Sequence, residues 1–166
     1  MSHIGTPAIR SDAWSKVNGE TIYTYDYKEA GMLYGVLLRS PHAAGKLLGC
    51  DLSKARAMPG VRAAIAANDV PLVLAGWSMR DTPLFARARV RYIGEPVAAV
   101  AAVDQLTARR AVALIEIEYE ELPAVLSIDQ AMAEDAPMVH DNFEELLKTY
   151  ESEHAPNVMS IMEVEE

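Results

Sequence analysis

The sequence predicts an α+β domain, and three observations support this class. Hydrophobic residues make up 51% of the 166 residues, which is enough to bury a core. Segments with the composition of β-strands alternate with short helical patterns. The connections between them include both hairpin-like and crossover spacings, which favour an α+β arrangement over a doubly wound sheet. We expect a mixed sheet with two main helices.

The N-terminal third is predicted to hold an extended arm followed by three strands. Residues 1–20 carry turn-forming residues and predict the arm. Thr21–Tyr25 is rich in β-branched and aromatic side chains and predicts a short strand. Met32–Arg39 is a long apolar run that predicts a central strand, which Ser40-Pro41-His42 ends because proline cannot donate to a strand ladder. Lys46–Asp51 predicts a return strand.

The next segment predicts a helix, a strand and an irregular connection. Leu52–Ala57 has a short helical pattern that Pro59-Gly60 ends. Val61–Ala67 predicts a strand, and Asn68–Pro71 predicts a turn. Residues 72–89 have no regular pattern and form a connection long enough to carry function.

The most apolar strand is predicted after a bend at Gly94-Glu95-Pro96. Val97–Val103 contains no charge, proline or glycine, as expected of a fully buried strand. Asp104 is a predicted helix cap. The helix after it has one apolar stripe at positions i, i+3, i+4 and i+7, formed by Ala108, Ala111, Val112 and Ile115.

The clearest alternating pattern follows this helix. Ile115, Ile117 and Tyr119 point to one side of the predicted strand. The other side carries Glu116, Glu118 and Glu120. This acidic row could bind calcium or supply an acid and a base, but carboxylates at alternate strand positions are more typical of a solvated face. A short helix is predicted at Ile128–Ala133.

Charge is distributed unevenly along the chain, whose net charge is −9. Residues 1–115 carry 14 Lys/Arg against nine Asp/Glu, whereas residues 116–166 carry only Lys148 against 15 Asp/Glu. A nucleic-acid partner is not expected, because phosphates would be repelled by the second part. We expect an arm over 1–20, a domain over 21–142, and an acidic linker with the start of a further, missing domain over 143–166.

The pattern of the N-terminus, the length of the apolar runs and the cysteine content predict a cytoplasmic protein without a membrane segment. No apolar run approaches the ~20 residues of a membrane span. The N-terminus lacks the pattern of a signal peptide. The single cysteine, Cys50, excludes an internal disulfide and an iron–sulfur cluster held by this chain alone. Its apolar neighbours predict a buried structural thiol rather than a nucleophile.

Familiar catalytic and cofactor motifs are missing from the sequence. It contains no Gly-x-Gly and no Gly-Lys-Ser/Thr, so neither a dinucleotide fingerprint nor a phosphate loop is expected. Gly76–Arg80 begins like a nucleophile elbow but lacks its second glycine. The histidines have no metal-ligand spacing; His140-Asp141 could be half of a ligand set, but a surface-loop histidine is the simpler interpretation.

Three arginines alternate before the predicted buried strand, at Arg87, Arg89 and Arg91. Alternation would place three guanidinium groups on one face of a strand. We interpret this face as solvated or as a domain-docking surface. The arginines could also bind an anionic ligand or the acidic C-terminal part.

Several stretches, in order over roughly residues 10–142, carry a resemblance to a known family. They are Tyr23–Asp26, Arg39–Ala43, Met58–Val61, Val90–Ala98 and Ile117–Pro123. Together they are similar to the N-terminal part of the molybdenum-binding large subunit of the xanthine dehydrogenase/aldehyde oxidase family. Two departures are Glu95, where that family usually has Gln, and Ala44-Gly45, where it often has a second His and an Ala.

The resemblance implies an α/β-hammerhead domain. It also implies a parent enzyme that uses molybdopterin-bound molybdenum, [2Fe-2S] clusters and FAD to hydroxylate a carbon of an aldehyde or N-heterocycle with oxygen from water. The family's catalytic and cofactor-binding residues lie outside the matched segments. We therefore expect no catalytic, cofactor-binding or metal-binding residue in this chain.

The main hypothesis is a structural domain that docks against the other molybdenum-binding domains and the iron–sulfur and flavin partners. The alternatives are a free-standing hammerhead module that binds a small ligand at residues 72–96, and a stand-alone enzyme using Glu95 and the arginines. The residues assigned to docking are Ser40, Pro41, His42, Arg87, Arg89, Arg91, Gly94, Glu95 and Pro96.

The C-terminal segment Asn157–Glu166 is predicted to be a strand separated from its partners. Both of its faces are largely apolar, as in a strand covered on two sides. An unpaired apolar strand favours pairing with another copy. We therefore expect self-association through residues 157–166.

Overall fold

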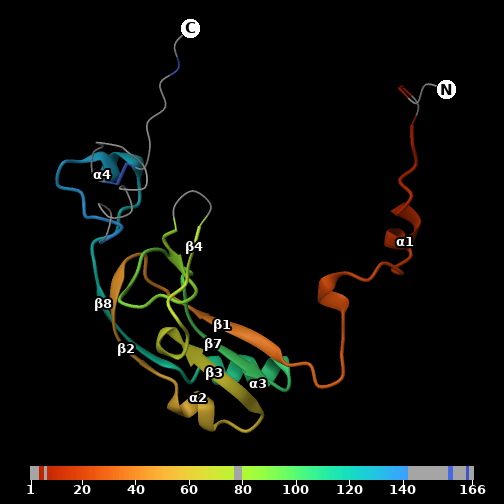
Figure 1. Ribbon diagram of the computed structural model, residues 1–166, viewed down its shortest axis with the longest axis horizontal. Helices are drawn as coiled ribbons and strands as arrows, with labels where there is room; N and C mark the ends of the chain where they lie inside the picture. Colours follow the sequence, from red (N-terminus) through yellow and green to blue (C-terminus); the bar gives the residue numbers. More distant parts are fainter. Residues whose placement is uncertain (1–3, 6, 77–79, 142–156, 159–163, 165–166) are drawn as a thin grey trace. The chain divides into compact units, whose positions relative to one another are not determined.

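The computed structural model describes all residues except 1–3, 6, 77–79, 142–156, 159–163 and 165–166. Its elements fall into two units, Met1–Met32 and Leu33–Glu166 (Figure 1). None of the described helices is long and apolar enough to cross a membrane.

The first unit contains two short helical segments. Helix α1 spans Ala13–Val17, so this part of the predicted extended arm is helical. The predicted strand over Thr21–Tyr25 is wrong, because the 3-10 helix η1 occupies Thr24–Asp26. The Asp26 carboxylate accepts a hydrogen bond from the Tyr23 amide at 3.1 Å, and the Asp26 amide donates to the Tyr23 carbonyl at 2.9 Å. This local capping competes with an extended backbone.

The larger unit is built around strand β7, Pro96–Ala102. It lies between β1 (Tyr34–Arg39) and β3 (Val61–Ala66), antiparallel to both, in the order β1-β7-β3. The prediction of a fully buried strand over Val97–Val103 is confirmed in part. Val97, Ala98 and Val100 are at most 2% exposed, whereas Ala99 and Ala101 are half-buried and Val103, which follows the strand, is 42% exposed. The prediction that Met32–Arg39 is the central strand is wrong. The charge-free β7 takes that position, and β1 forms an edge.

Two helices cover this sheet, as predicted (Figure 1). Helix α2 spans Ser53–Ala57 and α3 spans Gln105–Val112. Asp104 caps α3 by accepting a hydrogen bond from the Thr107 amide at 2.8 Å. The predicted apolar stripe is confirmed, because Ala111 and Ile115 are buried in the same core as Val100. Val112 packs against this core, and Ala108 is fully buried. The small size of the two alanines lets α3 approach the strands closely.

A second antiparallel sheet carries the alternating glutamates. Its order is β6-β2-β8, with β6 at Arg89–Val90, β2 at Gly45–Asp51 and β8 at Glu116–Glu121. The predicted solvated acidic face is confirmed, since the three glutamates of the row are exposed. Two of these glutamates form exposed ion pairs with lysines, and such pairs add little stability. The pairs are Lys54–Glu116 and Lys46–Glu120.

The remaining elements are short. The predicted turn after β3 is a 3-10 helix, η2, at Ala67–Asp69. Among the described residues between 72 and 88, β4 (Leu74–Ala75) and β5 (Thr82–Pro83) pair as a short hairpin, and the others belong to no helix or strand. Helix α4 spans Ile128–Met132. The strand predicted over Asn157–Glu166 lies largely outside the described residues.

The α+β class is confirmed, but the expected single mixed sheet is not present in the described part of the chain. All strand pairs described there are antiparallel and fall into separate sheets. The physical reason lies in the loop between β1 and β2, where Ser40 and Ala44 are buried. This loop carries the chain from one sheet into the other instead of closing a hairpin.

The two faces of β8 give a first prediction. Tyr119 packs against the cluster of Ala86, Val90 and Val97, and its ring centroid lies 4.7 Å from that of His42. Because Tyr119 is half-buried, Tyr119→Ala is expected to lower the free energy of unfolding by about 2–3 kcal/mol, less than the ~3–5 kcal/mol of a fully buried ring. Urea denaturation measures this loss. Glu118→Ala is the matched control and should stay within about ±0.5 kcal/mol; equal losses would contradict the assigned faces.

Candidate functional site

Two turns from distant parts of the sequence interlock at the start of β7. The Ser40 amide donates to the Glu95 carbonyl at 2.9 Å, and the Gly94 amide donates to the Ser40 carbonyl at 2.8 Å. The Arg39 guanidinium donates to the Gly94 carbonyl at 2.8 Å. Gly94 has a φ of 91°, which a residue with a side chain rarely adopts. We name this arrangement of residues 39–42 and 94–96 the junction.

Ser40 is the buried anchor of the first turn. It is 2% exposed. Its hydroxyl accepts a hydrogen bond from the His42 amide at 3.0 Å and donates to the His42 carbonyl at 3.1 Å. Both capacities of the hydroxyl are therefore used within the turn, while Pro41 remains exposed. This serine shapes the backbone and is not poised as a nucleophile.

Glu95 is the buried carboxylate of the second turn. It is 4% exposed, accepts a hydrogen bond from the Arg91 amide at 2.6 Å, and lies 3.6 Å from the Arg91 guanidinium. Burial raises the pKa of Glu95, and this effect outweighs the hydrogen bond and the positive charge of Arg91. These contacts hold the turn at residues 91–95 together. The buried carboxylate therefore has a structural role that requires no bound substrate.

The three arginines do not share one solvated face, so that part of the interpretation is wrong. Only Arg89 lies in a strand, the two-residue β6. The side chains of Arg89 and Arg91 are 14% and 20% exposed, whereas Arg87 is exposed. Arg89 forms an ion pair with Asp141, and Arg87 donates to the Val70 carbonyl at 2.7 Å. Arg89 therefore contacts the acidic C-terminal part, one of the alternatives left open by the sequence.

His140 is half-buried rather than a free surface histidine. Its Nε2 lies 3.4 Å from a carboxylate oxygen of Asp81. Burial lowers the pKa of His140, and the positive charge of Arg91 lowers it further. Within the described ranges, no group of three or more His, Cys, Asp or Glu side chains could hold a metal ion. The half ligand set suggested by His140-Asp141 is therefore not completed by the described residues.

A cavity of about 330 Å³ lies in the region where the sequence suggested a small ligand. Apolar side chains form part of its wall, and Arg87, Arg89 and Arg91 contribute positive charge. Two carboxylates line it as well: Asp141 forms an ion pair with Arg89, and Asp81 lies beside the imidazole of His140. The negative charge of these carboxylates offsets much of the positive charge with which the arginines could attract an anion.

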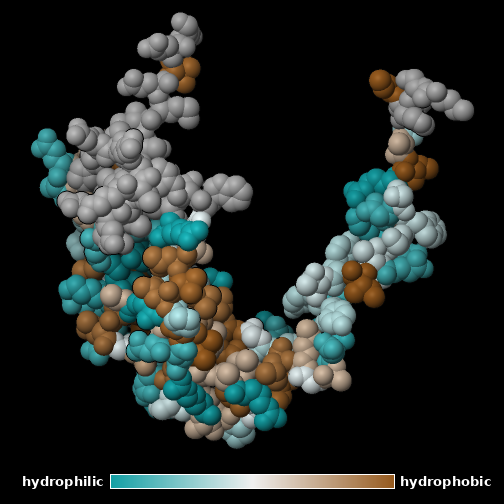
Figure 2. Space-filling model, viewed as in Figure 1, coloured by the Kyte–Doolittle hydropathy of each residue, from teal (hydrophilic) through white to brown (hydrophobic). Residues whose placement is uncertain are grey.

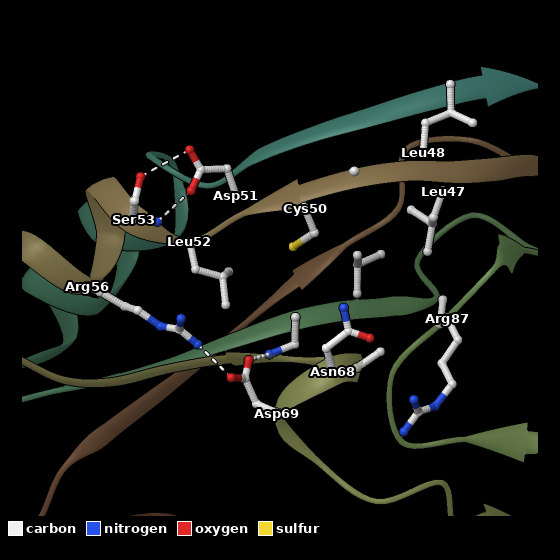
Figure 3. Close-up of a pocket in the computed structure, with 15 residues that line it drawn as sticks. Leu47, Leu48, Cys50, Asp51, Leu52, Ser53, Arg56, Asn68, Asp69 and Arg87 are labelled. Atoms are coloured by element: carbon white, nitrogen blue, oxygen red, sulfur yellow. Dashed lines mark hydrogen bonds and ion pairs between the residues drawn. The ribbon is translucent and has the colours of Figure 1, made fainter.

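A second, more spacious groove was not predicted from the sequence. It has a volume of about 510 Å³ and lies beside β2, and we name it the β2 groove. In Figure 3 the Cys50 sulfur and the Asn68 side chain face into it, with Arg87 at one end and Asp69 nearer the other. The prediction of a buried Cys50 is wrong, because Cys50 is exposed. Its pKa is raised by partial burial and then by Asp51, so a reactive thiolate is disfavoured.

Sequence reasoning missed this groove because its walls come from separate segments. Leu47 and Leu52 belong to β2 and its exit, Asn68 follows β3, and Ala86 precedes β6. No local spacing links these positions. Asp51 was the one sequence signal near this groove. Its carboxylate accepts a hydrogen bond from the Ser53 amide at 2.8 Å, where β2 ends and α2 begins.

The two antiparallel sheets, the interlocked junction and the covering helices define an α/β-hammerhead domain. Comparison with known families agrees: residues 18–123 match the family described as aldehyde oxidase and xanthine dehydrogenase, a/b hammerhead domain. The chain belongs to this family.

Two curated relatives are named as molybdenum-binding or molybdopterin subunits. The chain is 43% identical over 145 residues to the xanthine dehydrogenase molybdenum-binding subunit of Escherichia coli O157:H7, covering 80% of this chain and 19% of the relative. It is 35% identical over 140 residues to the nicotinate dehydrogenase large molybdopterin subunit of Eubacterium barkeri, covering 82% and 32%. The chain thus spans about a fifth to a third of the length of these relatives.

Solved structures show the same fold. Quinoline 2-oxidoreductase from Pseudomonas putida 86 superposes with a TM-score of 0.75 at 34% identity, covering 84% of this chain and 19% of that one. CO dehydrogenase from Oligotropha carboxidovorans gives a TM-score of 0.75 at 34% identity, covering 81% and 17%. These proteins have different substrates in their names, so the shared fold does not specify a substrate.

The burial of Glu95 gives a second prediction, on pH. Its pKa is raised in the folded state above the unfolded value of about 4.3. The stability it contributes is therefore fully present below the unfolded pKa and is lost as the pH rises through the folded pKa. Glu95→Gln removes this titration while keeping an acceptor for the Arg91 amide. Melting temperatures should match the wild type near pH 4 and exceed it at pH 8.

The matched control for this experiment is Glu118→Gln on the exposed face of β8. Its melting curve should follow the wild type, because substitutions of exposed polar residues change stability by about ±0.5 kcal/mol or less. A Glu95→Gln variant that is less stable than the wild type at pH 8 would show that the ion pair with Arg91 outweighs burial.

Proposed function

We propose that this chain is a structural docking domain within the large subunit of a molybdenum hydroxylase. The observation that carries the proposal is the hammerhead match over residues 18–123, in a chain that spans only about a fifth of its xanthine dehydrogenase relative. The parent enzyme would hydroxylate a carbon of an aldehyde or N-heterocycle with oxygen from water, in the cytoplasm. The domain's partners would be the other molybdenum-binding domains and the iron–sulfur and flavin subunits or domains.

A [2Fe-2S] cluster does not fit the described residues of this chain. A [2Fe-2S] cluster needs four cysteine ligands, and the sequence has only Cys50. The described His, Cys, Asp and Glu side chains form no group that could hold a metal. We therefore assign no step of the hydroxylation to this chain, and the molybdopterin and FAD sites to other parts of the assembly.

The junction supports a docking role because apolar side chains beside it are exposed. Ser40 and Glu95 are buried and hold the two turns in place. Tyr92 and Ile93, which lie in the sequence between β6 and Gly94, are 49% and 69% exposed. An exposed isoleucine beside an exposed aromatic ring is typical of a contact surface. In this proposal, of the nine residues assigned to docking, the buried ones position the surface, and Pro41 and Arg87 contribute to it directly.

A second exposed apolar surface lies near the β4–β5 hairpin. Leu72, Val73 and Leu84 are 60–62% exposed. Figure 2 shows hydrophobic surface over this hairpin and the loops beside it. Apolar side chains gathered in this way also suit a domain that packs against others.

The alternative function is a free-standing module that binds a small ligand at residues 72–96. The cavity of about 330 Å³ favours it, because small-molecule sites are commonly of this size or larger. Binding of an aldehyde or N-heterocycle to the isolated chain, measured by calorimetry, would support this alternative over the docking role.

A domain exchange tests the docking role. We expect a chimera in which this chain replaces the corresponding part of the Escherichia coli xanthine dehydrogenase molybdenum-binding subunit to assemble and oxidise xanthine. Ile93→Asp in the chimera should reduce assembly severalfold, because it places a charge in an apolar contact. Ile128→Asp on α4, where Ile128 is 82% exposed, is the matched control. Normal assembly of the Ile93→Asp chimera would contradict the assigned surface.

A cofactor assay tests the remaining part of the proposal. We expect the purified 166-residue chain to be colourless and to hold no stoichiometric molybdenum, iron or flavin. Elemental analysis and an absorption spectrum measure this directly. One molybdenum per chain would show that it binds the cofactor by itself.

A further inference from the structure

The two edges of the β1-β7-β3 sheet differ in how their backbone groups are bonded. At the β3 edge, side chains take the place of a further strand. The Arg56 guanidinium donates to the Ala64 carbonyl at 3.0 Å, and the Asp69 carboxylate accepts from the Ala66 amide at 2.9 Å. At the other edge, none of the described strands pairs with the side of β1 that faces away from β7 (Figure 1).

The direction of the β1 backbone groups follows from the residues at its end. The Ser40 amide donates to the Glu95 carbonyl, so the Ser40 backbone points to the β7 side. Arg39 lies opposite Pro96, which has no amide and whose carbonyl accepts from the Ala86 amide at 2.8 Å. Arg39 is therefore not bonded to β7, and its own amide and carbonyl point to the open edge.

The same direction recurs at every second residue of β1. Because the backbone groups of a strand point alternately to its two edges, those of Gly35 and Leu37 share the open edge with those of Arg39. The irregularity in the pairing falls between Leu38 and Arg39, where Val97 of β7 is the extra residue, so the alternation within β1 is unbroken. No hydrogen bond among the described residues occupies the Gly35 or Leu37 backbone on this side.

β1 also lacks the features by which natural sheets protect an edge. It contains no proline and no lysine, and its one charged residue, Arg39, stands at its end. Gly35 and Leu37 are exposed, and no atom lies within 4 Å of the position that a Cβ of Gly35 would occupy. A regular strand edge with so little charge is a template for pairing with another strand.

We propose that β1 pairs with β1 of a second copy of this chain, antiparallel and about a twofold axis at Leu37. In this register Leu37 faces Leu37 of the second copy, and Gly35 faces Arg39. All outward-pointing backbone groups then meet in hydrogen-bonded pairs. Moving the axis to Val36 or Leu38 would leave one of these residues unpaired on each strand. This inference does not rest on the proposed docking function.

The side chains along this edge are complementary to those of a second copy. The only charge of each strand, Arg39, meets Gly35, which has no side chain and open space around it, so the two like charges stay apart. Val36 lies opposite Leu38 of the second copy, on the face where Leu38 packs against the core with α3. Both side chains are only half-buried in one chain, and the pairing buries them further.

A strand of another protein gains no comparable recognition at this edge. The one charge that could attract an acidic partner is already used, because the Arg39 guanidinium donates to the Gly94 carbonyl. A second copy uses the same edge on both chains, so the pairing is closed. The side chains that cover the β3 edge keep the joined sheet from extending further. These features favour a dimer of this chain.

Opposite charges at the axis test the register. Leu37→Lys and Leu37→Glu each place two like charges opposite each other, so each variant of the full chain should dimerise about two- to fivefold more weakly than the wild type in sedimentation. An equal mixture of the two variants should restore dimerisation through mixed pairs. Restoration is specific to this register, because only an axis at Leu37 brings position 37 of both copies together.

Leu48→Lys on β2 is the matched control, because Leu48 is 55% exposed and lies outside the β1-β7-β3 sheet. This variant should dimerise as the wild type does. The proposal is wrong if the wild-type chain sediments as a monomer at every concentration, if Leu48→Lys weakens dimerisation as much as the Leu37 variants, or if the mixture restores nothing.

Amide hydrogen exchange tests the same pairing within the backbone. The Leu37 amide points to the open edge, so its exchange should slow as the protein concentration rises and dimers form. The Leu38 amide points to β7 and should exchange slowly at all concentrations. A Leu37 amide that is already slow in the monomer would show that the chain covers its own edge. One that stays fast in the dimer would show that the copies meet elsewhere, and either result overturns the proposal.

Discussion

Burial of β7 is the constraint on which the rest of this structure depends. Both edges of the strand are paired, and Val97, Ala98 and Val100 are at most 2% exposed. A strand buried in this way cannot carry charge, since an unpaired charge in an apolar core costs several kcal/mol. Polar residues are therefore confined to its two ends. The Gly94–Pro96 turn precedes it, and Asp104 follows it as the cap of α3.

The charged groups around the entry to β7 have partners within the protein. Arg91 lies beside Glu95, Arg89 pairs with Asp141, and Asp81 lies beside the imidazole of His140. Partly buried charges need such partners, because desolvation is otherwise uncompensated. The residues most suggestive of chemistry in the sequence therefore hold loops together. What this region presents outward is chiefly apolar, which is more typical of a domain that contacts others than of an active site.

The separation into two sheets produces the groove beside β2. Because β6 is only two residues long, it protects only the start of β2. Natural proteins seldom leave a longer edge uncovered. The edge that the described strands leave uncovered, together with the exposed Leu72 and Leu84, is the kind of surface on which the proposed docking role depends.

The sequence by itself determined the local elements whose patterns are strong: the charge-free β7, the capped and striped α3, and the alternating β8. The resemblance carried by segments such as Val90–Ala98 identified the hammerhead family. Strand order, the junction, the burial of Arg89 and the exposure of Cys50 were decided only by the tertiary structure. The physical reason is that they depend on hydrogen bonds and packing between segments some 50 residues apart, such as Ser40 with Glu95, and local periodicity contains no information about such partners.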